Sequence, residues 1–136
     1  MLVRGPTDLS ELRCKLPVPE RLAGRWAAVR LEQPGVFDFV RATIEVVAWI
    51  PVDDRELTWK DVADVLGAEQ QPTTVTMACD AVSALVPDQF DEMQVDGAHV
   101  EVRGPGYPAG AFEGQGFGAG RAVRIEGGLL VAVTTI

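Results

Sequence analysis

The chain has 136 residues, of which 47% are hydrophobic and 24% charged, a composition that suits one globular domain rather than a disordered chain. The formal net charge of −8 argues against a dedicated binder of nucleic acid or of anionic membranes, because both need a basic face. One histidine and two cysteines, in no metal-ligand spacing, leave few ligands for zinc and few bases for histidine-dependent catalysis, so we expect no metal and no cofactor.

The N-terminal part is predicted to be an extended arm. Residues 1–20 contain three prolines, which suit an extended or edge segment better than a helix, because proline lacks the backbone N–H. The first residues also lack the apolar run of a secretory signal. The longest apolar runs of the chain have five residues, whereas a membrane-spanning helix needs about 20. We therefore expect a protein that is made in the cytoplasm and has no membrane span.

Two strands joined by a hairpin are predicted next. A short strand is indicated over residues 24–32, and Pro34-Gly35 is a typical turn dipeptide. Over residues 36–50 the even positions are mainly apolar, whereas polar residues such as Thr43 occupy odd positions in the middle. This alternation predicts a long strand with one buried face, on which Ile44 points inward.

Two helices are predicted in the middle of the chain. Thr58 and Asp61 form a capping-box pattern before an amphipathic stretch that Gly67 ends, which indicates a helix near residues 58–66. A second helix is predicted over residues 74–86, because its apolar side chains follow a 3.6-residue period and a proline follows. The middle of the chain is also strongly acidic, which predicts an acidic surface there.

The C-terminal part is predicted to return to strands. Apolar and polar residues alternate from residue 99 and again near residue 123, and the alternation continues to the end of the chain. Gly127-Gly128 is either a tight turn between two strands or a bulge within one strand. Strands, then helices, then strands predict an α+β fold, with a mainly antiparallel sheet and two helices packed on one face.

The glycine-rich stretch from Gly104 to Gly120 is the main candidate for a functional segment. Its start fits a loose dinucleotide fingerprint, but no helix follows, so nucleotide binding is disfavoured. We expect a long loop between two strands, which is either a mobile hairpin loop or a segment that orders against a neighbouring subunit. In the second case Tyr107, Phe112 and Phe117 are partner-interface residues, exposed or mobile in the isolated subunit and covered by a neighbouring chain in the assembly.

Other reactive side chains are predicted to have structural roles. The acidic groups near residues 53–56 and 88–92 lack the ligand spacing of a calcium loop, and helix capping explains the first group. His99 falls on the polar face of a strand, and a Ser-His-Asp assembly has only the presence of these residue types in its favour. Cys14 and Cys79 are expected to be reduced thiols, and the tryptophans to be core or interface anchors. We therefore assign no catalytic, cofactor-binding or metal-binding residue.

The order of these features resembles that of the tail-terminator (tail-completion) proteins of long-tailed bacteriophages. The resemblance covers residues 12–66 and 98–136, and it is one of element order rather than of a motif. One feature departs from it, because those proteins usually begin with a helix and this chain begins with a segment that contains proline and glycine. The matching pieces are LRCKLPVPERLAGRWAAVRL, ATIEVVAWIPV, RELTWKDVADVL and, after the glycine-rich loop, RAVRIEGGLLVAVTTI.

The resemblance implies a homo-hexameric ring that closes the tail tube and meets the head-completion protein, and it carries over no catalytic residue. The leading hypothesis is therefore a non-enzymatic virion component, assembled in the host cytoplasm, whose partners are itself and other structural proteins. One alternative is a capsid decoration protein. Another is a small bacterial ligand-binding domain or enzyme in the cytoplasm, which uses residues 104–120 as a lid.

Overall fold

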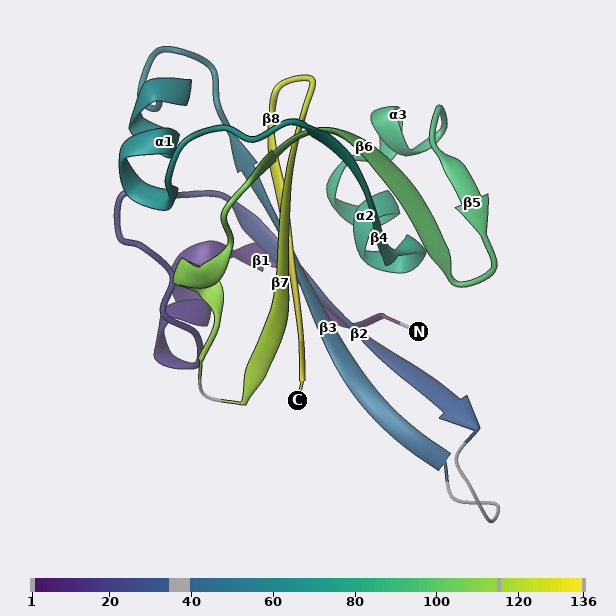
Figure 1. Cartoon of the computed structure of the whole chain (residues 1–136). Coiled ribbons are helices and arrows are strands. Elements are labelled where there is room, and N and C mark those ends of the chain that lie inside the picture. The colour runs from purple at the N-terminus through teal and green to yellow at the C-terminus, as the bar shows by residue number, and fades with distance from the viewer. Residues whose placement is uncertain (1, 35–39, 115, 136) are drawn as a thin grey trace.

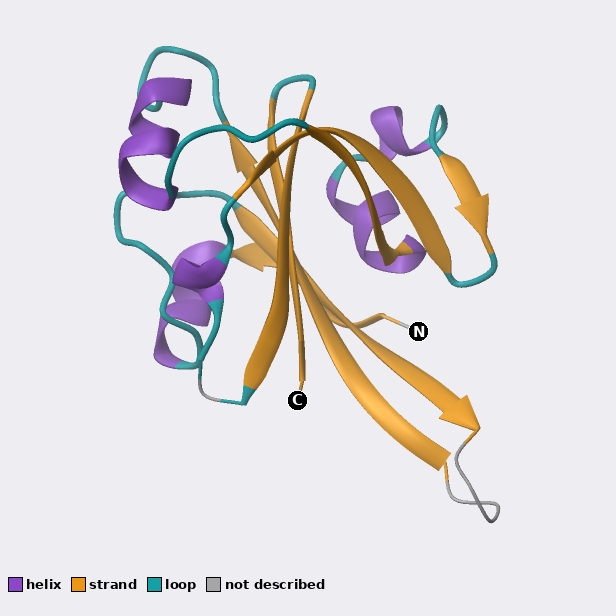
Figure 2. Ribbon diagram, viewed as in Figure 1, coloured by secondary structure: helices purple, strands orange, loops and turns teal. Residues whose placement is uncertain are grey.

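Strands dominate the computed structural model, which describes residues 2–34, 40–114 and 116–135 (Figures 1 and 2). The strands are β1 (Leu2–Asp8), β2 (Arg25–Pro34), β3 (Val40–Pro51), β4 (Pro72–Ala78), β5 (Gln94–Asp96), β6 (His99–Tyr107), β7 (Phe117–Ile125) and β8 (Gly128–Thr135). The helices are α1 (Trp59–Leu66), α2 (Cys79–Leu85) and α3 (Pro87–Phe90), and the 3-10 turns are η1 (Leu9–Cys14) and η3 (Gly110–Phe112).

The strands form one antiparallel sheet that curls into a half-barrel (Figure 2). Their order is β1-β2-β3-β8-β7-β6-β4, and β5 pairs with the first residues of β6. The pairing of β2 with β3 is the longest and runs in unbroken register from Arg25 opposite Trp49 to Pro34 opposite Val40. The expected α+β class with a mainly antiparallel sheet is confirmed. The turn expected at Pro34-Gly35 includes residues outside the described ranges.

Both faces of the sheet are covered, so the prediction of a one-sided strand is wrong. In β3, Val46 and Ile50 pack on one face, whereas Val47 and Trp49 between them pack on the other. The apolar run from Val46 to Ile50 is typical of a strand that is buried on both sides. The alternation of apolar and polar residues before this run instead indicated a single buried face. We call the first side the η1 face, since η1, η3 and α1 cover it, and the second side the α2 face.

The two longer helices lie on opposite faces of the sheet, and the expected packing of both on one face is not confirmed. Val62 of α1 is buried in the core of the η1 face, whereas Val82 of α2 is buried in the core of the α2 face. The predicted capping box of α1 is present. Thr58 Oγ accepts the Asp61 N–H at 3.1 Å, and the Asp61 carboxylate accepts the Thr58 N–H at 3.0 Å.

The helix predicted over residues 74–86 is wrong in its first part. Residues 72–78 form β4, and helix α2 occupies only Cys79–Leu85. Threonine and valine at positions 73–76 favour a strand. Met77 and Ala78 are buried in the core of the α2 face, and because a helix would also bury them, they fitted the helical pattern. Pro87 begins α3 rather than simply ending a helix. Within the described ranges, none of the helices has the length and apolar character needed to cross a bilayer.

The ends of the chain complete the two faces. Residues 2–8 form an edge strand, paired with β2 through an irregular register, whereas Leu9, Leu12 and Leu16 are buried in the core of the η1 face. Of the extended arm or edge segment expected over residues 1–20, residues 2–8 are an edge strand, whereas residues 9–14 form the packed 3-10 turn η1. At the other end, residues 126–127 form the tight turn between β7 and β8, since Ile125 pairs with Gly128.

Candidate functional site

The glycine-rich segment is mainly regular structure, so the expected long loop over residues 104–120 is wrong. Its first residues complete β6, its last residues begin β7, and η3 lies between them. The connection is residues 108–116, of which Gln115 is outside the described residues. At Gly104 a Cβ would lie 2.1 Å from the carbonyl oxygen of Arg124. This glycine therefore permits the close approach of two strands, rather than giving freedom to a loop.

The three aromatic residues expected at a partner interface lie in different surroundings. Tyr107 is 5% exposed and Phe112 is 3% exposed, and both pack in the core of the η1 face. Their expected exposure in an isolated subunit is therefore wrong, because Phe112 of η3 packs into this core and the Tyr107 ring stacks on Trp59 of α1. Phe117 differs, since it is half-buried and packs at the margin of the same core.

Phe117 lines an apolar cleft of about 270 Å³ at the end of the η1 face. Among the described lining residues the charged ones are Arg4 and Lys15, which stand at its rim, and the others are apolar. Because the wall comes from β1, η1, β2, β3 and β7, no single segment of the sequence contains it. We call this site the apolar cleft; it is lined by Val3, Arg4, Leu12, Lys15, Trp26, Ala28, Ile44, Val46 and Phe117.

The cleft lies where β2 and β3 leave the rest of the sheet. Pairing with β1 ends at Val29, and pairing with β8 begins at Glu45, so the β2-β3 ribbon continues alone beyond these residues. Figure 1 shows this ribbon extending past the other strands at the lower right. Ile44 is half-buried because it stands at the point of departure. A two-stranded ribbon by itself is marginally stable in water, so a neighbour that packs against it would stabilise it.

Contacts with β1 fix the indole ring of Trp26 in the wall of the cleft. The Trp26 indole N–H donates to the Asp8 carbonyl oxygen at 3.1 Å. The Arg4 guanidinium stands 5.6 Å from the ring centroid and 3.6 Å from a Glu11 carboxylate oxygen. Lys15 is exposed and forms no ion pair with another described residue. The cleft therefore combines a fixed apolar wall with a basic rim.

Tyr107 belongs to a cluster that ties α1 to β6 and β7. Its ring stacks on Trp59 with centroids 5.7 Å apart, and its hydroxyl donates to Glu69 Oε1 at 3.0 Å. Arg124 stands 4.1 Å from the Trp59 ring centroid and 3.0 Å from the same Glu69 oxygen. Burial, and then the neighbouring carboxylate, raise the pKa of Tyr107. The polar groups of the cluster form their hydrogen bonds and ion pair with one another, so we assign the cluster a structural role in holding α1 against β6 and β7.

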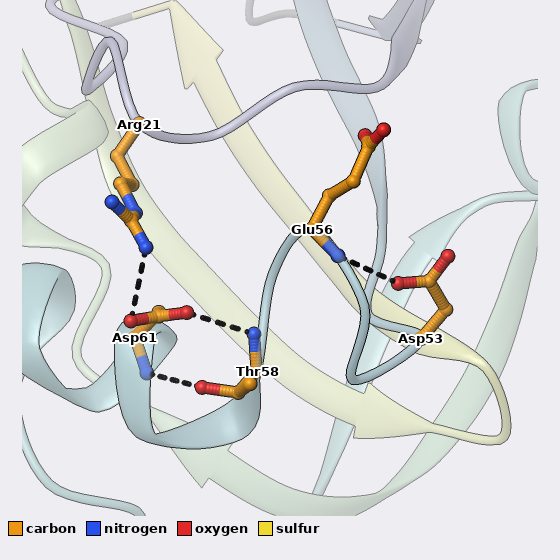
Figure 3. Close-up of polar contacts among 5 residues, drawn as sticks. All are labelled: Arg21, Asp53, Glu56, Thr58 and Asp61. Atoms are coloured by element: carbon orange, nitrogen blue, oxygen red, sulfur yellow. Dashed lines mark hydrogen bonds and ion pairs between the residues drawn. The ribbon is translucent and has the colours of Figure 1, made fainter.

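The acidic residues before α1 stabilise local structure. Asp53 Oδ1 accepts the backbone N–H groups of Arg55 and Glu56 at 3.0 and 3.4 Å, and the first of these bonds is the main cause of the lowered pKa of Asp53. Arg21 pairs with Asp61 at 3.1 Å, and Figure 3 shows the Glu56 carboxylate pointing away from that of Asp53. Among the described residues no group of three His, Cys, Asp or Glu side chains is placed to hold a metal ion.

The remaining reactive groups lie in α2 and in β6. Cys79 begins α2, and its thiol donates to the Gly97 carbonyl oxygen at 3.8 Å, while burial raises the pKa of this thiol. The Ser83 hydroxyl donates to a backbone carbonyl within α2, and His99 is half-buried in β6. The side chain of Cys14 is outside what the structure describes. The described hydrogen bonds of Cys79 and Ser83 therefore go to backbone carbonyl groups.

A buried ion pair is the feature that the sequence pattern missed. Glu45 is 2% exposed, although its odd position in β3 predicted a solvent face. Its carboxylate accepts the backbone N–H of Ala78 and pairs with the guanidinium of Arg121, which links β3 to β4 and β7. An acidic residue directly before an apolar run, as Glu45 is, is a signal of a buried ion pair. The sequence does not indicate which arginine is its partner.

Comparison with known proteins adds no relative, since no family model, no curated protein and no solved structure matches the chain. The feature with the clearest functional meaning is the apolar cleft, together with its basic rim and the adjoining ribbon.

Proposed function

We propose that this protein is a non-enzymatic assembly subunit that forms a ring-like homo-oligomer through the apolar cleft, as a virion component at the tail end of a long-tailed bacteriophage. The observation that carries the proposal is the cleft itself, in which half-buried Ile44 and Phe117 face solvent beside a basic rim. Covering apolar surface contributes about 25 cal/mol per Å². An apolar centre with a polar rim is the usual anatomy of a protein interface.

The ribbon beside the cleft supports the same proposal. Ile44 belongs both to the cleft and to the base of the ribbon, so a neighbour seated in the cleft would also reach the unsupported strands. Such a contact would cover the apolar side chains and stabilise the ribbon together. An enzyme would instead be expected to show convergent polar groups in its cleft.

The place at the tail end rests on the resemblance in element order. In that setting the ring has a second partner, the head-completion protein. The lid of the alternative ligand-binding hypothesis has less support, because Tyr107 and Phe112 are folded into the core of the η1 face. A decoration protein would use the same kind of cleft on a capsid surface, and imaging separates the two roles.

The test is the mass and shape of the purified protein in solution. We expect light scattering to give a multiple of the monomer mass and electron microscopy to show closed rings. Ile44→Ser should shift the protein towards the monomer. Leu31→Ser is the matched control, because Leu31 is half-buried in the same ribbon but packs on the α2 face. A wild-type protein that stays monomeric, or that binds capsids without forming rings, would overturn the proposal.

A further inference from the structure

Three large hydrophobic side chains are exposed among the described residues, and all three lie on edge strands. Leu2 and Val3 belong to β1, with exposed fractions of 37% and 49%, and Val3 lines the apolar cleft. Val95 is 52% exposed in the middle of β5, which pairs only with β6. Exposed apolar residues on a strand edge favour association with another chain. The chain therefore presents a second apolar feature, away from the cleft.

The chain segments that contribute to the two surfaces differ in net charge. Residues 1–30, which supply β1, η1 and most of β2, contain six basic side chains and three acidic ones. Residues 80–101, which surround β5, contain six acidic side chains and neither lysine nor arginine. At close range, Lys15 stands at the cleft beside Arg4, which pairs with Glu11, and Asp96 follows Val95 in β5 and points to the other side of that strand. A difference in charge of this kind steers one surface towards the other when two copies meet.

We propose that the apolar cleft receives the β5 edge of a second copy of this chain, with Val95 seated against Ile44 and Phe117 and with Asp96 beside Lys15. The inference rests on the proposed function, and it names the partner surface of that same site. It accounts for both apolar features with one contact, since each covers the other. It also supplies Lys15, which forms no ion pair with another described residue, with an acidic partner.

A contact between two different surfaces is head-to-tail. Figure 1 shows β5 at the right, whereas η1, the purple helical turn of the cleft, is at the lower left. Each copy therefore offers its cleft to one neighbour and its β5 edge to another. Repetition of such a contact gives a closed ring when the rotation between copies closes, and an open filament when it does not. The ring of the proposed function follows from this geometry without a second type of interface.

A mixing experiment tests the contact directly. Val95→Asp places a charge on the β5 edge and leaves the cleft intact. Ile44→Asp places a charge in the cleft and leaves the β5 edge intact. Each variant alone should be a monomer by native mass spectrometry. Their equimolar mixture should form a 1:1 heterodimer, because the intact cleft of the Val95→Asp variant can bind the intact β5 edge of the Ile44→Asp variant. No further copy can be added, since the remaining cleft and the remaining edge both carry the substitution. Thr73→Asp is the control, since it adds the same charge at an exposed position of the edge strand β4, opposite Gly104 and beyond the part of β6 that pairs with β5, and should leave the oligomer intact.

A charge exchange provides a second test. Asp96→Lys should weaken association at least tenfold, and the addition of Lys15→Asp to that chain should restore most of it. Circular dichroism checks that each variant is folded, and Phe117→Ser replaces Ile44→Asp if that variant is not. A wild-type monomer would overturn the proposed function itself. A wild-type oligomer with an unaffected Val95→Asp variant, or with a mixture that stays monomeric, would overturn only this inference.

Discussion

At the residue scale, Glu45 connects three strands that are far apart in the sequence. Its carboxylate accepts a backbone N–H from β4 and pairs with Arg121 of β7. Removing the acid would leave both partners without their acceptor in a site that water reaches poorly. The pair therefore belongs to the structure of the half-barrel, although its chemistry alone resembles a functional site.

We predict that Glu45→Ala lowers the free energy of unfolding by about 3 kcal/mol, near the lower end for a broken buried pair because Arg121 is partly exposed. Urea denaturation followed by circular dichroism measures this loss. Glu113→Ala is the control, because Glu113 is exposed and bonds only locally to Gly120. Equal losses in the two variants would show that the link between the strands contributes nothing of its own.

The capping box of α1 predicts a pH dependence. The backbone N–H of Thr58 lowers the pKa of Asp61 first, and Arg21 adds to the effect. A lowered pKa means that the carboxylate stabilises the fold above its unfolded pKa of about 3.9, and that this contribution is lost as the pH falls through the folded value. Asp61→Asn should therefore lower the urea midpoint at pH 7, and its effect should be smaller at pH 2.5. A difference that is the same at both pH values would contradict this assignment.

At the element scale, β8 shows how completely both faces of the sheet are covered. Leu129 and Leu130 are neighbours in this strand, and both are 0% exposed, one in the core of the η1 face and the other in the core of the α2 face. Neighbouring residues of a strand point to opposite sides. The strand is therefore packed on both sides, as β3 is.

We predict that Leu129→Ala and Leu130→Ala each cost roughly 2–5 kcal/mol of unfolding free energy, because each removes a fully buried side chain. The two substitutions form a matched pair, since residue type, strand and exposure are the same. Thermal and urea denaturation of both variants measures the losses. A large loss in one variant and a small one in the other would show that one face is open.

The β6–β7 connection predicts a contrast between two phenylalanines. Phe112→Ser should destabilise the monomer by roughly 3–5 kcal/mol, the range for removing a buried aromatic ring, since Phe112 is buried in η3. Phe117→Ser should cost the monomer much less and should weaken the oligomer, because Phe117 stands in the wall of the cleft. Denaturation and light scattering on both variants separate the two effects. The opposite pattern would place the interface at η3.

At the scale of the whole molecule, the separation of charge between residues 1–30 and 80–101 predicts that association depends on salt. The screening length falls from about 10 Å at 0.1 M salt to about 3 Å at 1 M. Sedimentation velocity should therefore show weaker association at 1 M sodium chloride. The double variant Lys15→Gln and Asp96→Asn should respond less than the wild type. Association that strengthens with salt in both proteins would indicate an interface without ion pairs.

The sequence by itself determined the features that depend on neighbouring residues. The capping box at Thr58, the end of α1 at Gly67 and the antiparallel pairing of residues 24–32 with the strand that follows were all predicted. The turn between β7 and β8 was one of two alternatives. Caps and turns are decided by hydrogen bonds within a few residues, so a local pattern is enough to predict them.

Only the tertiary structure decided what covers each surface. Residues 74–78 became a strand, Tyr107 and Phe112 entered the core, and Glu45 was buried, all through contacts with elements far away in the sequence. Of the candidate site, the sequence indicated Phe117 as an interface residue and Trp26 as a core or interface anchor. The rest of the cleft comes from β1, η1, β2 and β3, which the sheet brings together at one end. Burial is a property of packed elements, and no periodicity within one segment encodes which other segment will cover it.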